Sequence, residues 1–211
     1  MRRRKFKIKN KMAEKIDVSI LVACLGDYRP TLEAIKSADK AGYSYEILVC
    51  GDVFYDETKD DVVYFPDTGT SVSAYNHMFK NSKGDYIICL SCVVIPPPNL
   101  FDAIKELKRQ EAEGAKLVVT SLGTKSGGAP IVPQWAALDV NNDTDTPVLG
   151  WTAADKPKSR PQILRWPLFS RKSLNKYFGG VIFNPHFKHH WADNWLGTFC
   201  HFFGEEKKEL P

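Results

Sequence analysis

Continuous apolar runs, rather than alternating ones, recur along the first 122 residues. The runs are DVSILVACL (17–25), YEILVC (45–50), VVYF (62–65), GDYIICL (84–90) and AKLVVTSL (115–122). Unbroken runs rich in β-branched residues are typical of strands that are covered on both faces, whereas half-exposed strands alternate. The runs therefore predict five strands of one buried sheet.

Helical patterns separate these strands. Pro30 opens a segment in which Leu32, Ile35 and either Ala34 or Ala38 share one face, and Gly42 closes it. We expect a second helix over 71–81, and a third that is capped by Asn99 or the prolines before it and runs to about Glu113. Strand and helix alternate with short connections. This order predicts an α/β fold with a doubly wound, mostly parallel, Rossmann-like sheet and helices on both faces.

The pattern changes after residue 122. Gly, Pro, Asn, Asp and Thr dominate the stretch up to Pro161, which predicts a long loop region. Trp135 and Trp151 favour a structured contact surface there, because disordered segments are poor in aromatic residues. From residue 163 onward we expect a strand, a short helix, a turn at Gly179 and Gly180, and a final amphipathic helix.

Charge is concentrated at the amino terminus. The net charge is +4, yet the first 11 residues alone contain seven Arg and Lys, so the remainder is slightly acidic. We therefore expect a basic flexible tail over 1–15 and a single domain over 16–211. Nucleic-acid binding is not expected of this body. Contact of the tail with a membrane surface stays open as a weaker alternative.

Cysteine usage favours a reducing, cytoplasmic location. There are five cysteines, and Cys24, Cys50 and Cys89 lie in apolar runs, where cysteine behaves as a small hydrophobic residue. Cys89 and Cys92 have the spacing of a redox or zinc pair, but in a strand their side chains point to opposite faces and no second pair follows. We therefore favour the interpretation that these cysteines pack in the hydrophobic core.

Ligands of such sheets bind beyond the carboxyl ends of the strands. Around these ends, VSILVACLGDYRPTLEAIKSA, YEILVCGD, DTGTSVSAYNHMFKNSKGDYI, VIPPPNLFDAI and FNPHFKHHWADNWLGTFCHFFG resemble segments of the family-2-type glycosyltransferases with the GT-A fold. The resemblance extends from Val18 to Gly204. It implies that a sugar moves from a nucleotide-diphospho-sugar to the hydroxyl of a glycan or other acceptor, with inversion.

The resemblance also implies a donor site in the half over 16–122. Asp52 matches the carboxylate that contacts the base and ribose, and a carboxylate can accept hydrogen bonds from both. The other donor-site positions are Cys24, Gly69, Asn76, Ser91, Cys92 and Val93. Asn76 has an alternative structural role on a helix face, and Gly69 is expected to adopt a positive φ or to permit a close backbone approach.

The half over 123–205 is expected to serve the acceptor. By resemblance, Asp193 is the general base that takes the proton of the attacking hydroxyl. Aromatic surroundings would raise its pKa and offer rings for stacking on sugars. The candidate acceptor contacts are Trp135, Trp151, Trp191 and Trp195.

One expected feature is missing. Relatives hold Mg²⁺ or Mn²⁺ with an Asp-x-Asp motif, where this chain has Ser91, Cys92 and Val93, and neither a thiol nor an isopropyl group suits a hard cation. Three alternatives stay open. In the first, fixed cations such as Arg165 and Arg171 neutralise the charge of the leaving diphosphate. In the second, a metal is bound elsewhere through His186, His190 or His201. In the third, the chain is a non-catalytic module that binds a nucleotide-sugar or a glycan.

Overall fold

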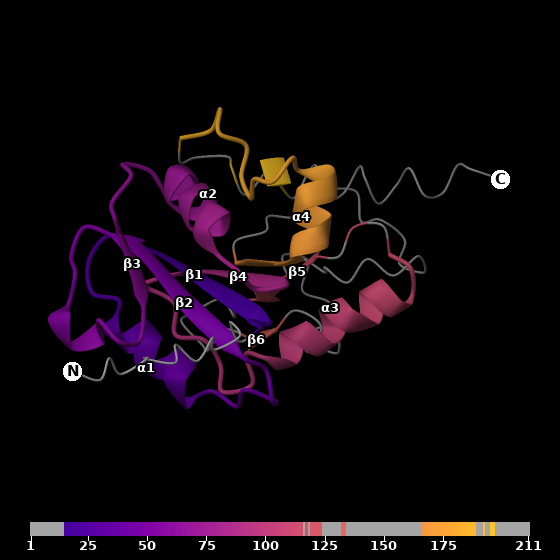
Figure 1. The fold of residues 1–211 in the computed structure, drawn as a ribbon, viewed down its shortest axis with the longest axis horizontal. Coiled ribbons are helices and arrows are strands. Elements are labelled where there is room, and N and C mark those ends of the chain that lie inside the picture. Colours follow the sequence, from indigo (N-terminus) through magenta and orange to yellow (C-terminus); the bar gives the residue numbers. More distant parts are fainter. Residues whose placement is uncertain are drawn as a thin grey trace, which may run out of the picture.

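Seven strands form one sheet in the computed structural model, which describes residues 15–115, 117, 119–123, 132–133, 166–188, 192 and 195–196 (Figure 1). The strands are β1 (Val18–Cys24), β2 (Tyr45–Gly51), β3 (Val63–Pro66), β4 (Tyr86–Ser91), β5 (Val119–Gly123), β6 (Val132–Pro133) and β7 (Pro167–Ser170). Their order across the sheet is β3-β2-β1-β4-β7-β5-β6.

The first four strands are parallel, and β1 lies in their centre. β7 runs antiparallel to both of its neighbours, β4 and β5, so β5 points the same way as β4. This topology confirms the predicted doubly wound, mostly parallel sheet. The insertion of β7 between β4 and β5 had no signal in the sequence, because strand order depends on pairing between distant segments.

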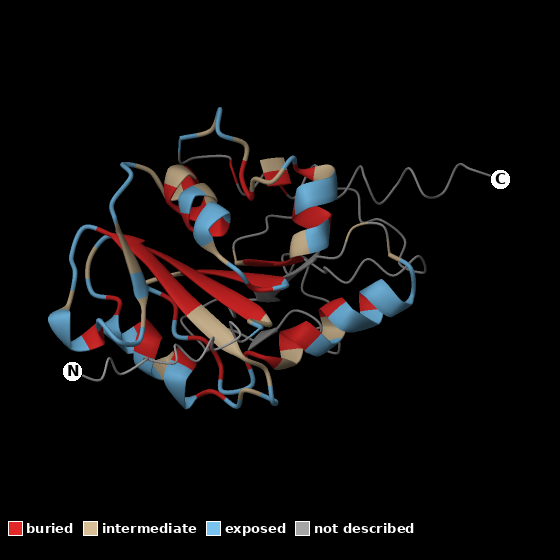
Figure 2. Cartoon of the chain, viewed as in Figure 1, coloured by how far each residue is buried: buried red, intermediate tan, exposed pale blue. Residues whose placement is uncertain are grey.

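Helices cover both faces of the sheet (Figure 1). α1 (Arg29–Ser37) and α3 (Asp102–Ala112) pack on one face, against the side chains of Val18, Ile20, Val22 and Cys24. α2 (Ser71–Asn81) and α4 (Arg171–Tyr177) pack on the other face, against Leu21 and Ala23. A short 3-10 helix, η1 (Asp56–Thr58), follows β2. Burial in Figure 2 accordingly concentrates in the strands and on the inner sides of the helices.

Two predicted helix ends differ from the structure. α1 already ends at Ser37, before the predicted stop at Gly42, and α3 begins with a different cap. Pro30 lies in the first turn of α1, and the Thr70 hydroxyl accepts a hydrogen bond from Ser73 N at 3.1 Å to cap α2. The predicted cap of α3 by Asn99 is wrong. Two successive backbone turns lead into α3, and Phe101 occupies the cap position with no side-chain hydrogen bond.

The core interpretation of the cysteines is confirmed for three of them. Cys24, Cys50 and Cys89 are buried free thiols, and Cys92 is a half-buried one. The cytoplasmic location stays a prediction. No helix in the described ranges combines the length and the apolar character that crossing a bilayer requires.

The amino-terminal edge of the sheet is closed by a polar network. The Ser19 hydroxyl donates to Glu46 Oε1 at 2.7 Å and accepts from Gly84 N at 2.7 Å. Gly84 is packed so closely that an added Cβ would lie 2.4 Å from Ser19 N and 2.6 Å from Val18 C. Backbone atoms cannot move away without shifting β1, so a side chain does not fit at position 84.

We predict that Gly84→Ala destabilises the fold by about 1 to 3 kcal/mol or more, because the new methyl group forces β1 and β4 apart. The midpoint of urea denaturation measures the loss. Lys83→Ala, at the exposed neighbouring position, serves as the control and should unfold like the parent. An unchanged midpoint for Gly84→Ala would contradict the close approach of the two segments.

Candidate functional site

The carboxyl ends of β1, β2 and β4 meet at one edge of the sheet. The pairing places Cys24 beside Gly51, and Ala23 beside Ser91. Because these strands are parallel, the loops that follow them leave in the same direction. The structure thus brings together five of the predicted donor-site residues: Cys24, Asp52, Ser91, Cys92 and Val93. We call this region the carboxyl edge.

Asp52 ties two of these loops together. Its Oδ1 accepts a hydrogen bond from Gly26 N at 2.9 Å, which connects the loop after β2 to the loop after β1. Gly26 has a φ of +122°, a conformation that favours glycine. The strands approach closely here, since a Cβ at Gly51 would lie 2.8 Å from Cys24 O. Asp52 remains exposed at the surface, so its carboxylate has access to a ligand.

The end of β4 forms a tight turn instead of presenting acids. Val94 N donates to Ser91 O at 3.0 Å, which closes the turn over 91–94. The Ser91 hydroxyl oxygen is buried and has no hydrogen-bond partner among the described residues, and Val93 is 82% exposed. From α1, the buried Thr31 hydroxyl lies 3.0 Å from Cys92 O and 2.8 Å from Val94 O. Thr31 of α1 therefore holds the backbone of this turn in place.

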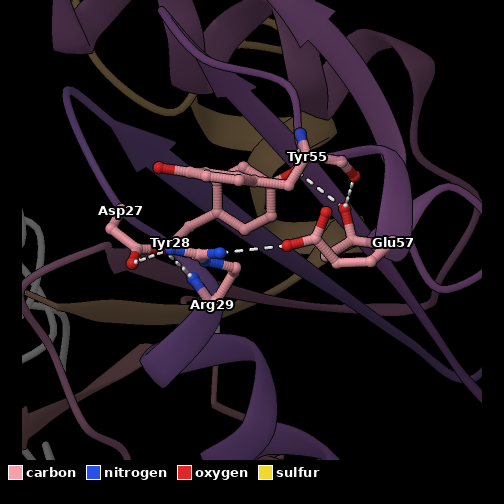
Figure 3. A network of polar contacts seen from close by, with 6 residues as sticks. Asp27, Tyr28, Arg29, Tyr55 and Glu57 are labelled. Atoms are coloured by element: carbon pink, nitrogen blue, oxygen red, sulfur yellow. Dashed lines mark hydrogen bonds and ion pairs between the residues drawn. The ribbon is translucent and has the colours of Figure 1, made fainter.

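A charged and aromatic cluster flanks the same edge (Figure 3). The Arg29 guanidinium pairs with Asp27 Oδ2 at 2.9 Å and with Glu57 Oε1 at 3.0 Å, and it lies 4.2 Å from the centre of the Tyr55 ring. Hydrogen bonds from the Arg29 side chain lower the pKa of Asp27. The buried Tyr28 anchors the cluster, because its hydroxyl lies 2.8 Å from that of Thr58. The carboxylates balance the Arg29 charge, yet the guanidinium stays partly exposed.

Sequence reasoning missed Arg29 and Tyr55 as candidate site residues. Arg29 directly follows the loop after β1, so its proximity to the strand end was a usable signal. The contact with Tyr55 depends on how the loop after β2 folds back over α1, and the sequence has no pattern for this.

Two predicted donor contacts, Arg171 and Asn76, bond to the backbone of the protein itself. Arg171 lies next to Ser170, which pairs with Tyr86 at the start of β4, so Arg171 is at the amino-terminal edge, opposite the carboxyl edge. Its side chain donates to Gly84 O at 2.6 Å and to Ser82 Oγ at 2.7 Å, and burial lowers its pKa. Arg171 therefore belongs to the network that closes the amino-terminal edge.

Asn76 is the second of these residues. Its Oδ1 accepts from Ile182 N at 2.8 Å and from Phe183 N at 3.1 Å, while its Nδ2 donates to Phe183 O at 2.8 Å. The amide thus pairs with the backbone of a distant segment, which is the structural role left open from the sequence. Gly69 has a φ of +85°, as expected, and would meet no atom within 4 Å with an added Cβ.

Several predicted residues lie outside the described part of the chain. They are Asp193, Arg165, Trp135, Trp151, Trp191, His190 and His201. Of the remaining aromatic and histidine candidates, Trp195 is half-buried with its ring 6.3 Å from that of Phe187 and 6.4 Å from that of Phe178. His186 is exposed.

The carboxyl edge does not suit a hard divalent cation. Such ions prefer several oxygen ligands, often carboxylates, whereas the end of β4 offers one hydroxyl, one thiol and one apolar side chain. Among the described residues, no three His, Cys, Asp or Glu side chains gather as metal ligands would. The described residues at the end of β4 therefore do not fit the metal that the family resemblance implies.

Comparison with solved structures identifies the fold. The chain superposes on S. aureus TarS 1–349 in complex with UDP with a TM-score of 0.56 and 14% identity, over 90% of this chain and 56% of that one. For the mannosyltransferase PcManGT from Pyrobaculum calidifontis, in complex with GDP-Man and Mn²⁺, the values are 0.54 and 15%, over 90% and 52%. The bifunctional IspDF from Campylobacter jejuni has a TM-score of 0.50 and 9% identity, over 87% of this chain and 47% of that one.

These likenesses show a GT-A-type, Rossmann-like fold and confirm the predicted resemblance in fold. The chain spans about half the length of each of these three proteins. The sequence matches no protein-family model and none of the curated proteins compared with it.

Proposed function

We propose that this protein binds a nucleoside-diphospho-sugar at the carboxyl edge and transfers the sugar to an acceptor hydroxyl with inversion. The observation that carries the proposal is the convergence of Cys24, Asp52 and Ser91 at the ends of parallel strands, in a fold shared with proteins solved with UDP and GDP-Man. Open sheets of this kind bind ligands at that edge. We place the protein in the cytoplasm on the strength of its free thiols.

Asp52 and the cluster around Arg29 are the proposed recognition groups for the nucleoside. An exposed carboxylate can accept hydrogen bonds from a base N–H or a ribose hydroxyl, and the Tyr55 ring and the partly exposed guanidinium offer flat surfaces for stacking. Of the two arginines that the sequence suggested for the diphosphate, Arg171 lies at the opposite edge of the sheet. Arg165, outside the described residues, is the proposed phosphate ligand. Arginine binds phosphate through two parallel donors.

The absent acids favour a second candidate, a non-catalytic module that binds a nucleotide-sugar or a glycan. A thermal-shift series with UDP, GDP and their sugar conjugates tests binding, because a ligand of the native state alone raises the apparent stability. Donor hydrolysis and transfer assays then separate the candidates. If a nucleotide stabilises the protein but no turnover is found, the binding-module hypothesis is supported. If none of these nucleotides and conjugates stabilises the protein, both hypotheses are refuted.

Replacing Asp52 should weaken nucleotide binding. For Asp52→Ala we expect a loss of about 1 to 3 kcal/mol of UDP or GDP binding free energy, as when one polar partner of a hydrogen bond is removed. Asp52→Asn retains an oxygen for Gly26 N but loses the charge and should also bind more weakly. Calorimetry measures both, and Asp60→Ala, an exposed carboxylate near η1, should bind like the parent. Equal affinities for all four proteins would remove Asp52 from the site.

Removal of divalent metal should leave turnover unchanged. The leaving diphosphate still requires stabilisation in the transition state, and preorganised cations of the protein can supply it. We therefore expect the transfer rate in EDTA to equal the rate in buffer with Mg²⁺ or Mn²⁺. A rate that vanishes in EDTA and returns with Mn²⁺ would instead show that a metal is bound by other residues.

Asp193 is the proposed general base. Asp193→Asn keeps the size of the side chain but cannot take the proton of the attacking hydroxyl, so turnover should fall by ~10²-fold or more while donor affinity stays constant. Asp60→Asn makes the same chemical change elsewhere and should retain the parent rate. An Asp193→Asn enzyme with full turnover would show that another residue is the base.

A further inference from the structure

Two thiols from neighbouring strands lie together at the carboxyl edge. Ala23 pairs with Ser91 in the register, and Cys92 N donates to Ala23 O at 3.3 Å, so Cys24 and Cys92 are the residues that directly follow this last pair on the two chain segments. Both side chains pack against the same buried cluster, which includes α1 and α3. The sequence separation of 68 residues gave no sign of this contact.

The placement suits a disulfide. Neighbouring strands lie ~4.8 Å apart, and disulfides form where the two Cα atoms are roughly 4.4 to 6.8 Å apart and the Cβ atoms face each other. The other described cysteines are arranged differently. Cys50 and Cys89 pack on the opposite face of the sheet, and β1 separates the strands that carry them.

The two thiols differ in access. Cys24 is 5% exposed, and burial raises its pKa. Cys92 is half-buried on the surface turn. An oxidant from solution therefore meets the Cys92 sulfur first, and Cys24 lies behind it in position to react next.

We propose that Cys24 and Cys92 are a redox-convertible pair that a peroxide oxidises to a disulfide. The Cys92 thiolate attacks one peroxide oxygen, the O–O bond breaks, and a sulfenic acid and one molecule of water result after proton transfer. The Cys24 sulfur then attacks the sulfenic sulfur, and the departing hydroxide takes the Cys24 proton as a second water. Two thiols lose two electrons, and hydrogen peroxide is reduced by the same two electrons.

Oxidation alters the edge that holds the loop after β1. In the reduced protein the Cys24 thiol donates to Gly26 O at 3.1 Å, and the Cys92 sulfur lies 3.9 Å from Leu25 O. A disulfide has no S–H, so both contacts with this loop lose their donor. The loop is the one bonded to Asp52. Weaker nucleotide binding by the oxidised protein is therefore expected, and this consequence rests on the proposed function.

Peptide mapping of the full chain tests the pair. After treatment with hydrogen peroxide and blocking of free thiols, digestion without reductant should yield a cross-linked peptide that contains Cys24 and Cys92 and has lost two hydrogens. Reductant should reverse it. In Cys24→Ser, a sulfenic-acid probe should label Cys92, whereas in Cys92→Ser it should leave Cys24 unlabelled.

Cys89→Ala is the matched control, because it removes a buried thiol on the other face and should leave the cross-link intact. A folded parent that keeps both thiols free, or that cross-links either one to Cys50, Cys89 or Cys200, would overturn the pair. UDP affinity of the reduced and oxidised protein is measured in parallel. A reversible cross-link in a protein that binds neither UDP nor GDP in either state would refute the proposed function and leave the pair standing.

Discussion

The parallel pairing of β1 with strands on both sides is the constraint on which the rest depends. Every residue of β1 is buried, and its backbone bonds to β2 on one edge and β4 on the other. Its alternate side chains supply the core on both faces of the sheet. A slip of one residue would exchange these two sets of side chains. The register therefore decides which strand ends meet at the carboxyl edge.

The loops at that edge are held by a small number of polar contacts. Asp52 joins the loops after β1 and β2, and Thr31 holds the turn after β4 from α1. The opposite edge is closed separately, by the Ser19 network and by Arg171. The paired strands thus fix where the loops begin, and single side chains fix the positions of the loops. Such a division allows the chemistry of the edge to change without a change of fold.

The turn after β4 shows how side chains set the chemistry of this edge. A buried hydroxyl, a thiol and an exposed isopropyl group occupy the place where the resemblance implies carboxylates. Because the backbone turn is held by Thr31 and by its own hydrogen bond, it does not need a bound cation to keep its shape. The same turn puts Cys92 beside Cys24, so this edge carries two sulfurs where the resemblance implies the oxygen ligands of a metal.

The sequence by itself determined the elements, because a buried strand or an amphipathic helix leaves a local pattern. The runs of β1, β2 and β4 and the segment of α2 were predicted almost to the residue, and with them the edge where Asp52 and Ser91 lie. Tertiary structure alone decided which side chains face that edge. Arg171 follows a correctly predicted strand, yet the antiparallel course of β7 carries it to the opposite edge. Asn76 binds a backbone segment more than 100 residues away, and Cys24 meets Cys92 only because β1 and β4 pair in one register. These contacts depend on strand order and direction, which arise from the packing of distant segments and leave no mark on the local sequence.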